Sequence, residues 1–506
     1  MRLDSKWSAL LPIIRDICSI SGIPGVSLGI VENNKSVYTA SLGYADIESK
    51  TPCDSDTTFV LGSLSKSMTA ALVASLHDDG IISSWDAPLK TLLPEFHRED
   101  IYGEITLADL LTHRTGLASL DSLWLASNNI PYLSRSEAVR ILNYAPGIQP
   151  FRTQFMYNNF GYEVLGQPAR LYRTYYTGES RENEAKPYAA LEDRSIVPIA
   201  PPLHGDNVLM GPAGGVRSSV NDLLTLYKAF MGAAHHEIIH PDTGSPDQLK
   251  STIRGINQLW KGHQSLPFHS LREHSYGFGW ARAQLPAVIS QGSDASTPNP
   301  MLALYHGGVI PGFNTYNVLL PETGSAVVVL TNSQSLNGGV RWIGELLVEA
   351  LLNNSHNAPD YSILAKESAE IALQQVKNIN KSLAAGRTIE TPSRPLEVYV
   401  GKYFNGARNF FIEIGYSKDK TSLQAAYMGR KADTFALLPY QEDSFYWTLT
   451  YDESAKLARE PIFPIEYHII KFGSDVNRTG VSCLWWQHQS GLPEPGGAIQ
   501  EDRDRF

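Results

Sequence analysis

The spacing of apolar residues in the first part of the chain predicts a helix followed by a β-hairpin. Apolar positions recur at helical spacing over Trp7–Ser19. After a turn at Ser21–Pro24, the runs Gly25–Val31 and Ser36–Leu42 are typical of strands, and the polar turn Glu32–Lys35 joins them. The chain is therefore expected to begin with a helix packed beside two antiparallel strands.

A second helical pattern follows Ser63 and ends at Gly80. The apolar residues between them stand four apart, at Leu64, Met68, Leu72 and Leu76. This pattern predicts a buried helix with Ser63 as its N-cap and Gly80 as its stop signal. Ser63 is thus expected at a helix N-terminus.

The later part of the first 383 residues combines strands with helices. Three runs are strand-like and two are helix-like, namely Met301–Tyr305, Thr315–Leu320, Ala326–Thr331, Val340–Leu352 and Tyr361–Leu383. Strands flanked by helices at both ends of this region indicate an α+β fold in which helices pack on an antiparallel sheet.

The composition changes at Ala384–Pro395, where Gly, Thr and Pro indicate a linker. Beyond it, seven short runs with turns between them predict a small β-barrel. They are Leu396–Phe404, Phe410–Tyr416, Ser422–Met428, Thr434–Tyr440, Ser444–Leu449, Ile465–Ile470 and Val481–Gln487. We therefore expect a catalytic domain over residues 1–383, a linker over 384–395 and a barrel domain over 396–506.

Composition and charge exclude several functional classes. The chain has 42 Lys and Arg against 52 Asp and Glu, a net charge of -10 without a basic stripe, which disfavours nucleic acid and anionic membranes as partners. Cys18, Cys53 and Cys483 are widely spaced and predict neither disulfides nor a thiolate zinc site. No apolar run reaches the length of a membrane span, and Pro12 and Arg15 interrupt any signal-peptide core. We expect a cytoplasmic protein, and its oligomeric state stays open.

Three short motifs suggest catalysis by a serine nucleophile. They are S-x-x-K at Ser63–Lys66, Y-x-N at Tyr157–Asn159 and H-x-G at His306–Gly308. Residues three apart on a helix share a face, so a neutral Lys66 amine could take the proton of the Ser63 hydroxyl. The helix N-terminus favours the negative charge that develops at an attacked carbonyl.

A second set of matches shows how common such motifs are. Ser417–Lys420, Tyr403–Asn405 and Lys471–Gly473 fit the same three patterns in the barrel region. They stand in a different order, and Ser417 precedes a polar turn instead of a helix. We interpret this set as an ordinary turn and strand ends.

The surroundings of the first set resemble the class-C-like branch of the serine β-lactamase and penicillin-binding protein superfamily. The matching blocks stand in the family's order at Gly43–Asp46, Leu61–Ala70, Leu110–Leu117, Tyr157–Tyr162, Pro212–Ser219, Tyr276–Trp280 and His306–Phe313. The resemblance implies an antiparallel sheet flanked by helices and an all-helical subdomain. It also implies acyl transfer from a small-molecule ester or amide.

The resemblance also implies roles for individual residues. Ser63 corresponds to the acylated nucleophile, Lys66 and Tyr157 to a coupled proton shuttle, and Asn159 to an amide that positions Lys66 and the substrate. The backbone N–H groups of Ser63 and Val309 correspond to an oxyanion hole. This machinery needs neither a cofactor nor a metal ion, so we expect none.

The third motif departs from that of many family members. Where many β-lactamases have Lys-Thr-Gly or Lys-Ser-Gly, this chain has His306, Gly307 and Gly308, as in the family's esterases, D-amino-acid peptidases and fungal acyltransferases. We assign these residues to the substrate-binding strand. A weakly basic His is a poorer partner for a β-lactam carboxylate than Lys, so ester or amide turnover is favoured over antibiotic hydrolysis.

The C-terminal region resembles the lipocalin-like domain that follows the catalytic domain in some of these hydrolases. This resemblance rests on Tyr399–Tyr403 and on the strand pattern. Trp485 and Trp486 could line a substrate mouth, although packing inside the barrel is the favoured interpretation.

Three rival interpretations use other features. Gly25–Gly29 matches the nucleophile elbow G-x-S-x-G, but Ser27 lies in a β run with no helix after it. His236–His240 matches the zinc motif H-E-x-x-H, although Pro241 disfavours a helix there. A catalytically inactive binding protein with the same fold is the third alternative, and the intact motif residues give it no support.

Long connections around the motifs suggest the nature of the substrate. They contain far more apolar and aromatic residues than a connection needs, namely Leu123, Trp124, Leu125, Ile130, Tyr132, Leu133, Tyr175, Tyr176, Tyr188, Trp260 and Phe268. Long segments of this kind often form binding sites, and apolar clefts suit large non-polar ligands. We therefore expect a bulky, hydrophobic ester or amide. The alternative is that these side chains pack the connections onto the body.

Overall fold

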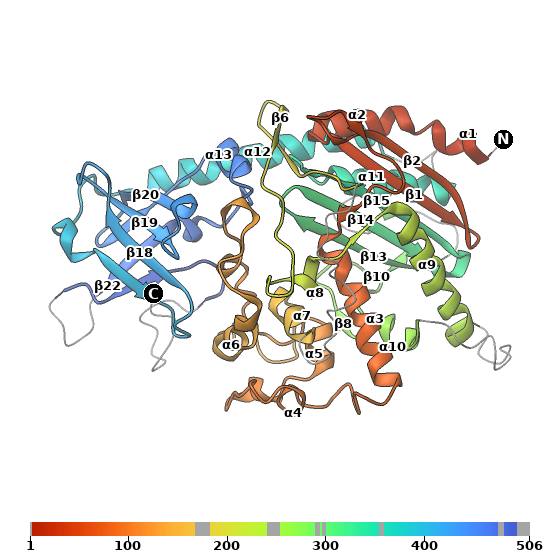
Figure 1. Cartoon of the computed structure of the whole chain (residues 1–506), viewed down its shortest axis with the longest axis horizontal. Coiled ribbons are helices and arrows are strands. Elements are labelled where there is room, and N and C mark those ends of the chain that lie inside the picture. The colour runs from red at the N-terminus through yellow and green to blue at the C-terminus, as the bar shows by residue number, and fades with distance from the viewer. Residues whose placement is uncertain are drawn as a thin grey trace.

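The fold consists of a large sheet-containing body and a smaller barrel at its side (Figure 1). The computed structural model describes residues 3–166, 183–239, 253–288, 294–295, 300–353, 359–473 and 480–492. In Figure 1 the C-terminal barrel lies beside the body, and the helix α12 (Tyr361–Gly386) runs between the two.

The body is built on a nine-stranded sheet with the strand order β3-β2-β1-β15-β14-β13-β10-β9-β8. All neighbouring pairs are antiparallel. The strands are β1 (Gly25–Glu32), β2 (Lys35–Asp46), β3 (Thr51–Pro52), β8 (Gln264–Ser265), β9 (His274–Tyr276), β10 (Ala281–Leu285), β13 (Met301–Ile310), β14 (Phe313–Leu320) and β15 (Ser325–Thr331). The predicted antiparallel sheet is thus confirmed.

Helices cover both faces of this sheet because its central strands are apolar on both faces. In β15, Val327 and Val329 belong to the core shared with α2 (Leu11–Ser21) and α11 (Gly339–Leu351). The alternate residues Val328 and Leu330 belong to the core on the opposite face, shared with α9 (Val220–Ala234). Successive strand side chains point to opposite faces, so a run of consecutive apolar residues requires cover on both.

The N-terminal helix differs from the expectation for Trp7–Ser19. Two helices occupy this region, α1 (Leu3–Ser8) and α2, which begins at Leu11 with a proline in its first turn. Pro12 has no N–H to donate, so it fits the first turn of a new helix but not the interior of a longer one.

Further helices and short strands complete the body of the protein. The helices are α3 (Ser65–Asp78), α4 (Leu89–Leu92), α5 (Leu107–Leu111), α6 (Ala138–Tyr144), α7 (Asn159–Leu165), α8 (Gly211–Gly214) and α10 (Ile256–Leu259). The strands are β4 (Phe59–Val60), β5 (Tyr188–Ala190), β6 (Ile196–Pro198), β7 (Arg217–Ser218), β11 (Ala287–Val288), β12 (Asp294–Ala295) and β16 (Ser333–Gln334). Figure 1 shows α4 to α8 gathered below the sheet, as a helical subdomain requires.

The C-terminal region forms a seven-stranded, barrel-like sheet in which neighbours in sequence are neighbours in the sheet. The strands are β17 (Gly401–Phe404), β18 (Phe411–Tyr416), β19 (Leu423–Tyr427), β20 (Thr434–Pro439), β21 (Ser444–Tyr446), β22 (Ile469–Gly473) and β23 (Cys483–Trp486). The predicted barrel is confirmed, and the sequence did not predict its helix α13 (Tyr451–Lys456). Helix α12 continues to Gly386, into the segment expected to be a linker.

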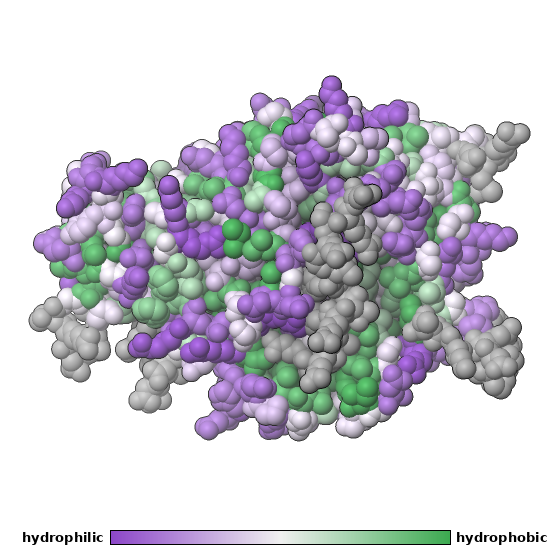
Figure 2. All heavy atoms as spheres, in the orientation of Figure 1, coloured by the Kyte–Doolittle hydropathy of each residue, from purple (hydrophilic) through white to green (hydrophobic). Residues whose placement is uncertain are grey.

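The visible surface is polar with small apolar groups between the hydrophilic residues (Figure 2). Of the helices in the described ranges, none combines the length and the apolar character needed to cross a bilayer.

Candidate active site

Ser63 lies in a tight turn that joins strand β4 to helix α3. The turn is a 3-10 helix, Gly62–Leu64, directly before the first residue of α3. Ser63 is not the N-cap of α3, contrary to the sequence expectation, because the helix begins at Ser65 and Leu64 is its N-cap. The Ser63 Oγ accepts a hydrogen bond from the hydroxyl of Tyr157 at 2.7 Å.

Two glycines bring strand β13 against this turn. Gly62 has a φ of +55°, and a Cβ there would lie 2.7 Å from the backbone nitrogen of Val309. A Cβ on Gly308 would collide with the carbonyl oxygen of Leu61. Only glycine tolerates both the left-handed backbone and the close approach. The amide of Val309 is therefore held next to the Ser63 turn.

Lys66 is fully buried next to Ser63. Its Nζ lies 3.0 Å from the Ser63 Oγ, 2.8 Å from the Asn159 Oδ1 and 2.7 Å from the carbonyl oxygen of Ala213. Burial lowers its pKa to about 7, and the Coulomb attraction of Asp121 partly opposes this shift. A substantial fraction of Lys66 is thus neutral near pH 7.

Tyr157 is positioned by a buried histidine. The Nδ1 of His113 accepts a hydrogen bond from the backbone N–H of Asn158 at 3.0 Å, and the His113 ring packs against the Tyr157 ring with centroids 4.3 Å apart. Desolvation by the surrounding protein raises the pKa of the Tyr157 phenol. Tyr157 is therefore protonated and acts as a hydrogen-bond donor.

Asp121 extends this network, and the sequence motifs did not include it. Its Oδ1 accepts hydrogen bonds from the Asn159 side-chain amide and from the Trp124 indole N–H, each at 3.0 Å. Asn159 thus connects Asp121 to Lys66. Desolvation raises the pKa of the Asp121 carboxyl, and Lys66 opposes this shift. No motif identifies Asp121, because it belongs to a connection without a repeated pattern.

His306 lies on β13 with both ring nitrogens engaged. The Nδ1 is 2.6 Å from the carbonyl oxygen of Gly307, and the Nε2 is 2.9 Å from the hydroxyl of Tyr276. The Nδ1 must carry the proton to bind a carbonyl, so the Nε2 accepts from Tyr276. Burial and the nearby Lys66 lower the pKa of His306 to about 4, which keeps the ring neutral. His306 is 8% exposed and does not line the cavity described next.

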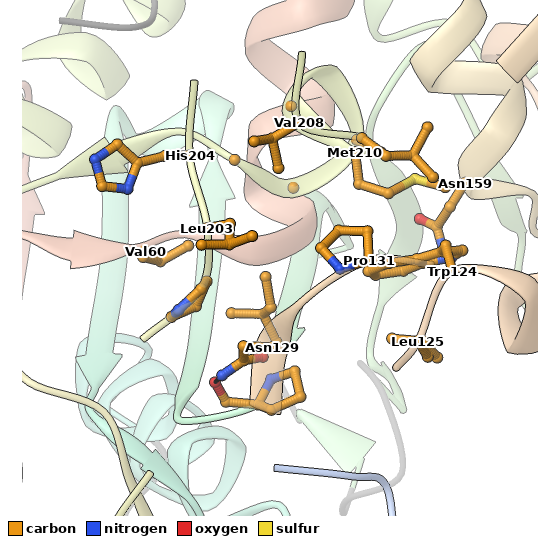
Figure 3. Close-up of a pocket in the computed structure, with 18 of the residues that line it drawn as sticks. Val60, Trp124, Leu125, Asn129, Pro131, Asn159, Leu203, His204, Val208 and Met210 are labelled. Carbon is orange, nitrogen blue, oxygen red and sulfur yellow. Dashed lines mark hydrogen bonds between the residues drawn. The ribbon is translucent and has the colours of Figure 1, made fainter. Parts of the chain in front are cut away.

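A cavity opens from Ser63, and most of its lining is apolar. It encloses about 820 Å³, counting the open space at its mouth. Its lining includes Trp124, Leu125, Ile130, Pro131, Leu203, Val208, Met210 and Val309. Figure 3 shows Pro131 and Trp124 near Asn159, with Val60 and Leu203 across the space. Polar groups gather at one corner, where Arg217 forms an ion pair with Glu184 at 2.8 Å and contacts His204.

The aromatic residues of the connections divide between this cavity and the core. Trp124 lines the cavity as expected. Trp260 and Tyr188 are buried in the core, and Phe268 lies outside the cavity lining against His274, so these three follow the alternative that the connections pack onto the body. Leu123, Leu133 and Trp486 are also buried, and Tyr132 packs on the barrel. Tyr175 and Tyr176 lie outside the described residues.

The described residues of the rival motifs make structural contacts. Ser27 is buried in β1 and hydrogen-bonded to Ser41 and to the carbonyl of Asp54. Ser417 binds Asp419 in the turn between β18 and β19. Of the zinc motif, His240 lies outside the described residues, and the Glu237 carboxylate accepts the backbone N–H groups of Gly255 and Asn257.

Comparisons with known proteins identify relatives of this chain. Two fungal relatives match over most of their length. The unguisins hydrolase ungD of Aspergillus violaceofuscus is 26% identical, with 95% of this chain and 90% of that protein covered. The unguisins hydrolase ungD' of Aspergillus campestris is 24% identical, with 92% of this chain and 86% of that protein covered.

The fold is shared with a solved structure. The octameric penicillin-binding protein homologue from Pyrococcus abyssi aligns with a TM-score of 0.55 at 20% identity, covering 89% of this chain and 94% of that chain. The family model described as Beta-lactamase matches residues 13–350, which include all three motifs around Ser63. The chain therefore belongs to the beta-lactamase family.

Proposed function

We propose that this protein is a serine hydrolase that forms an acyl-enzyme on Ser63 from a bulky, hydrophobic ester or amide. One observation carries the proposal. The Ser63 hydroxyl lies between the Lys66 amine and the Tyr157 hydroxyl, and Ser63 lines a largely apolar cavity. A nucleophile, a base and a binding surface therefore meet at one point.

The contacts of Lys66 support its role as the general base. A neutral amine has two N–H groups and one lone pair. The side-chain oxygen of Asn159 and the backbone carbonyl oxygen of Ala213 can accept the two N–H groups, at 2.8 and 2.7 Å. The lone pair then points to the third neighbour, the Ser63 hydroxyl at 3.0 Å. The lowered pKa makes this form accessible near neutral pH.

The proposed reaction has two stages. In the first, the Ser63 Oγ attacks the carbonyl carbon while Lys66 takes the hydroxyl proton. The N–H groups of Ser63 and Val309 stabilise the resulting oxyanion. The intermediate then collapses, and the leaving group receives a proton from Tyr157, which Lys66 reprotonates. In the second stage, a water molecule attacks the acyl-enzyme with the same groups as base and acid, which releases the acid and regenerates Ser63.

Two observations support a hydrophobic substrate that has no carboxylate for the protein to bind. The cavity wall next to Ser63 is formed largely by aliphatic side chains and Trp124. His306 is neutral with both nitrogens engaged within the protein, so it supplies no cation for a β-lactam carboxylate. We assign to His306 a positioning role on β13. The names of the two fungal relatives favour hydrolysis over transfer to another acceptor.

Labelling with a fluorophosphonate tests the nucleophile. Intact-protein mass spectrometry should show one adduct, located on Ser63, in the wild type. Ser63→Ala should remove both the adduct and turnover. Ser67→Ala is the matched control, because Ser67 is buried on the same helix and its hydroxyl binds the Leu64 carbonyl. Labelling at another serine, or turnover retained by Ser63→Ala, would refute the proposal, and no labelling would favour an inactive binding protein.

Substrate comparison and chelation test the remaining parts. A long or polycyclic ester should be hydrolysed with a higher kcat/KM than nitrocefin or a short p-nitrophenyl ester. Fastest turnover of nitrocefin would assign β-lactams as substrates instead.

Activity that is lost with a chelator and restored by zinc would favour the His236–His240 motif over Ser63.

A further inference from the structure

One segment of the helical subdomain faces both the active site and the barrel. We call residues 119–131 the pocket segment. On the catalytic side, its Asp121 binds Asn159, which binds Lys66. Its Trp124, Leu125, Ile130 and Pro131 line the cavity. The position of the pocket segment therefore affects both the base and the substrate-binding wall.

Two residues that follow strand β23 of the barrel, His488 and Gln489, hold the pocket segment beside Asp121. The backbone N–H of Leu120 donates to the Oε1 of Gln489 at 3.0 Å. The Ser122 hydroxyl lies 2.6 Å from the Nδ1 of the buried His488. These two contacts are made by the residues directly before and after Asp121 in the sequence.

A buried ion pair of the barrel domain holds the other half of the pocket segment. Asp433 accepts the backbone N–H of Ser127 at 2.8 Å. Arg459 contacts Asp433 at 2.8 Å and the Ser127 hydroxyl at 3.2 Å. Arg430 donates to the carbonyl oxygen of Ile130 at 3.0 Å. The barrel thus binds the segment from Leu120 to Ile130.

The pocket segment has little regular structure of its own to fix its shape. It contains two short 3-10 turns, Asp121–Leu123 and Ser127–Asn129. Leu120, Asn128 and Asn129 have φ values of +52°, +61° and +56°. Asparagine adopts this backbone conformation readily, but it is strained for Leu120, so neighbouring structure must impose it there. The barrel contacts lie at or next to these positions.

We propose that the C-terminal barrel is a positioning element of the active site, and that it acts through the pocket segment. His488 and Gln489 hold Asp121 in contact with Asn159, while Asp433 and Arg459 hold the cavity wall. This inference rests on the proposed function of Ser63. It assigns the barrel a catalytic purpose although no barrel residue touches the cavity within the described chain.

The double variant His488→Ala with Gln489→Ala tests the inference. We expect its kcat/KM for a bulky ester to fall about tenfold. The acid limb of its pH–rate profile should move to lower pH, because Asp121 no longer opposes the lowered pKa of Lys66. Hydrogen exchange in the pocket segment should accelerate. If the role of the barrel were purely structural, the double variant would change in thermal stability, but the acid limb of its pH–rate profile would not move.

Ser444→Ala is the matched control. Ser444 is a buried polar residue of the barrel, and its hydroxyl accepts the backbone N–H of Gln441 within the barrel. The inference is overturned if the double variant and Ser444→Ala have the same kcat/KM, the same acid limb in the pH–rate profile and the same rate of hydrogen exchange in the pocket segment. Failure of the proposed function would look different, because the wild type itself would then not be labelled at Ser63.

Discussion

The side-chain amide of Asn159 donates a hydrogen bond to Asp121 at 3.0 Å, while its oxygen accepts from Lys66 at 2.8 Å. A single amide thus links a carboxyl group to the proposed catalytic base. The carboxylate attracts the ammonium form of Lys66 and so opposes the effect of burial on its pKa. This relationship makes Asp121 the residue that tunes the base.

Asp121→Asn should therefore lower the pKa of Lys66 further. The acid limb of kcat/KM should move to lower pH, because Lys66 becomes neutral at a lower pH. The asparagine oxygen can still accept from Asn159, so the activity at the plateau should be largely retained. The pH–rate profiles of the wild type and the variant provide the measurement. An acid limb that stays in place or moves to higher pH would contradict the role assigned to Asp121.

The activity of the wild type should rise with pH through a group with a pKa of about 7. Burial lowers the Lys66 pKa from its usual 10.5, and only the neutral amine can take the Ser63 proton. The rate should therefore be lost as the pH falls below about 7 and should reach a plateau above it. Measurement of kcat/KM from about pH 5 to about pH 10 tests this. A rise only near the ordinary lysine pKa would exclude Lys66 as the base.

Gly62→Ala should reduce kcat by about 10² to 10³, as expected for loss of an oxyanion donor. The new Cβ would lie 2.7 Å from the Val309 nitrogen and would force β13 away from the turn. Gly80→Ala is the control, because Gly80 also has a left-handed backbone, with a φ of +74°, but no atom within 4 Å of its Cβ position. The control should lose about 1 kcal/mol of stability and keep its activity. Equal kcat values for the two variants would disprove the oxyanion assignment.

Leu203→Ser should raise KM for a bulky ester about tenfold and leave a short ester unaffected. Leu203 lines the cavity and is 50% exposed, so the substitution removes apolar contact with the substrate at little cost in folding. Ile81→Ser is the control, because Ile81 is 67% exposed and lies outside the cavity lining. Equal changes in KM for the long and short esters would argue that this wall does not contact the substrate.

Patterns of residues close along the chain were sufficient to predict individual helix turns and strands. The spacing of Ser63 and Lys66 placed both on one turn of a helix, and their side chains meet at 3.0 Å. The apolar run Ala326–Thr331 predicted a strand, which is found as β15, and the strand pattern after Leu396 predicted the barrel. Single proline positions were harder to interpret, because Pro12 fits the first turn of a helix as well as a break between two helices.

Composition alone could not predict which aromatic residues face the substrate. Trp124 and Trp260 both belong to long connections, yet Trp124 lines the cavity and Trp260 packs against Phe230 in the core. A tryptophan is apolar enough for either place. The packing of neighbouring elements determines which tryptophan faces the cavity, and no periodic pattern in the sequence indicates that packing.

The sequence by itself determined the turn at Ser63 and the apolar patterns of the strands, because each depends on residues close along the chain. The tertiary structure decided which groups meet around Ser63. Asp121 and Asn159 are 38 positions apart, and Ser122 and His488 are 366 positions apart. The contact between Ser122 and His488 forms only where the barrel packs against the helical subdomain, and the pocket segment has no periodic pattern that would predict either contact.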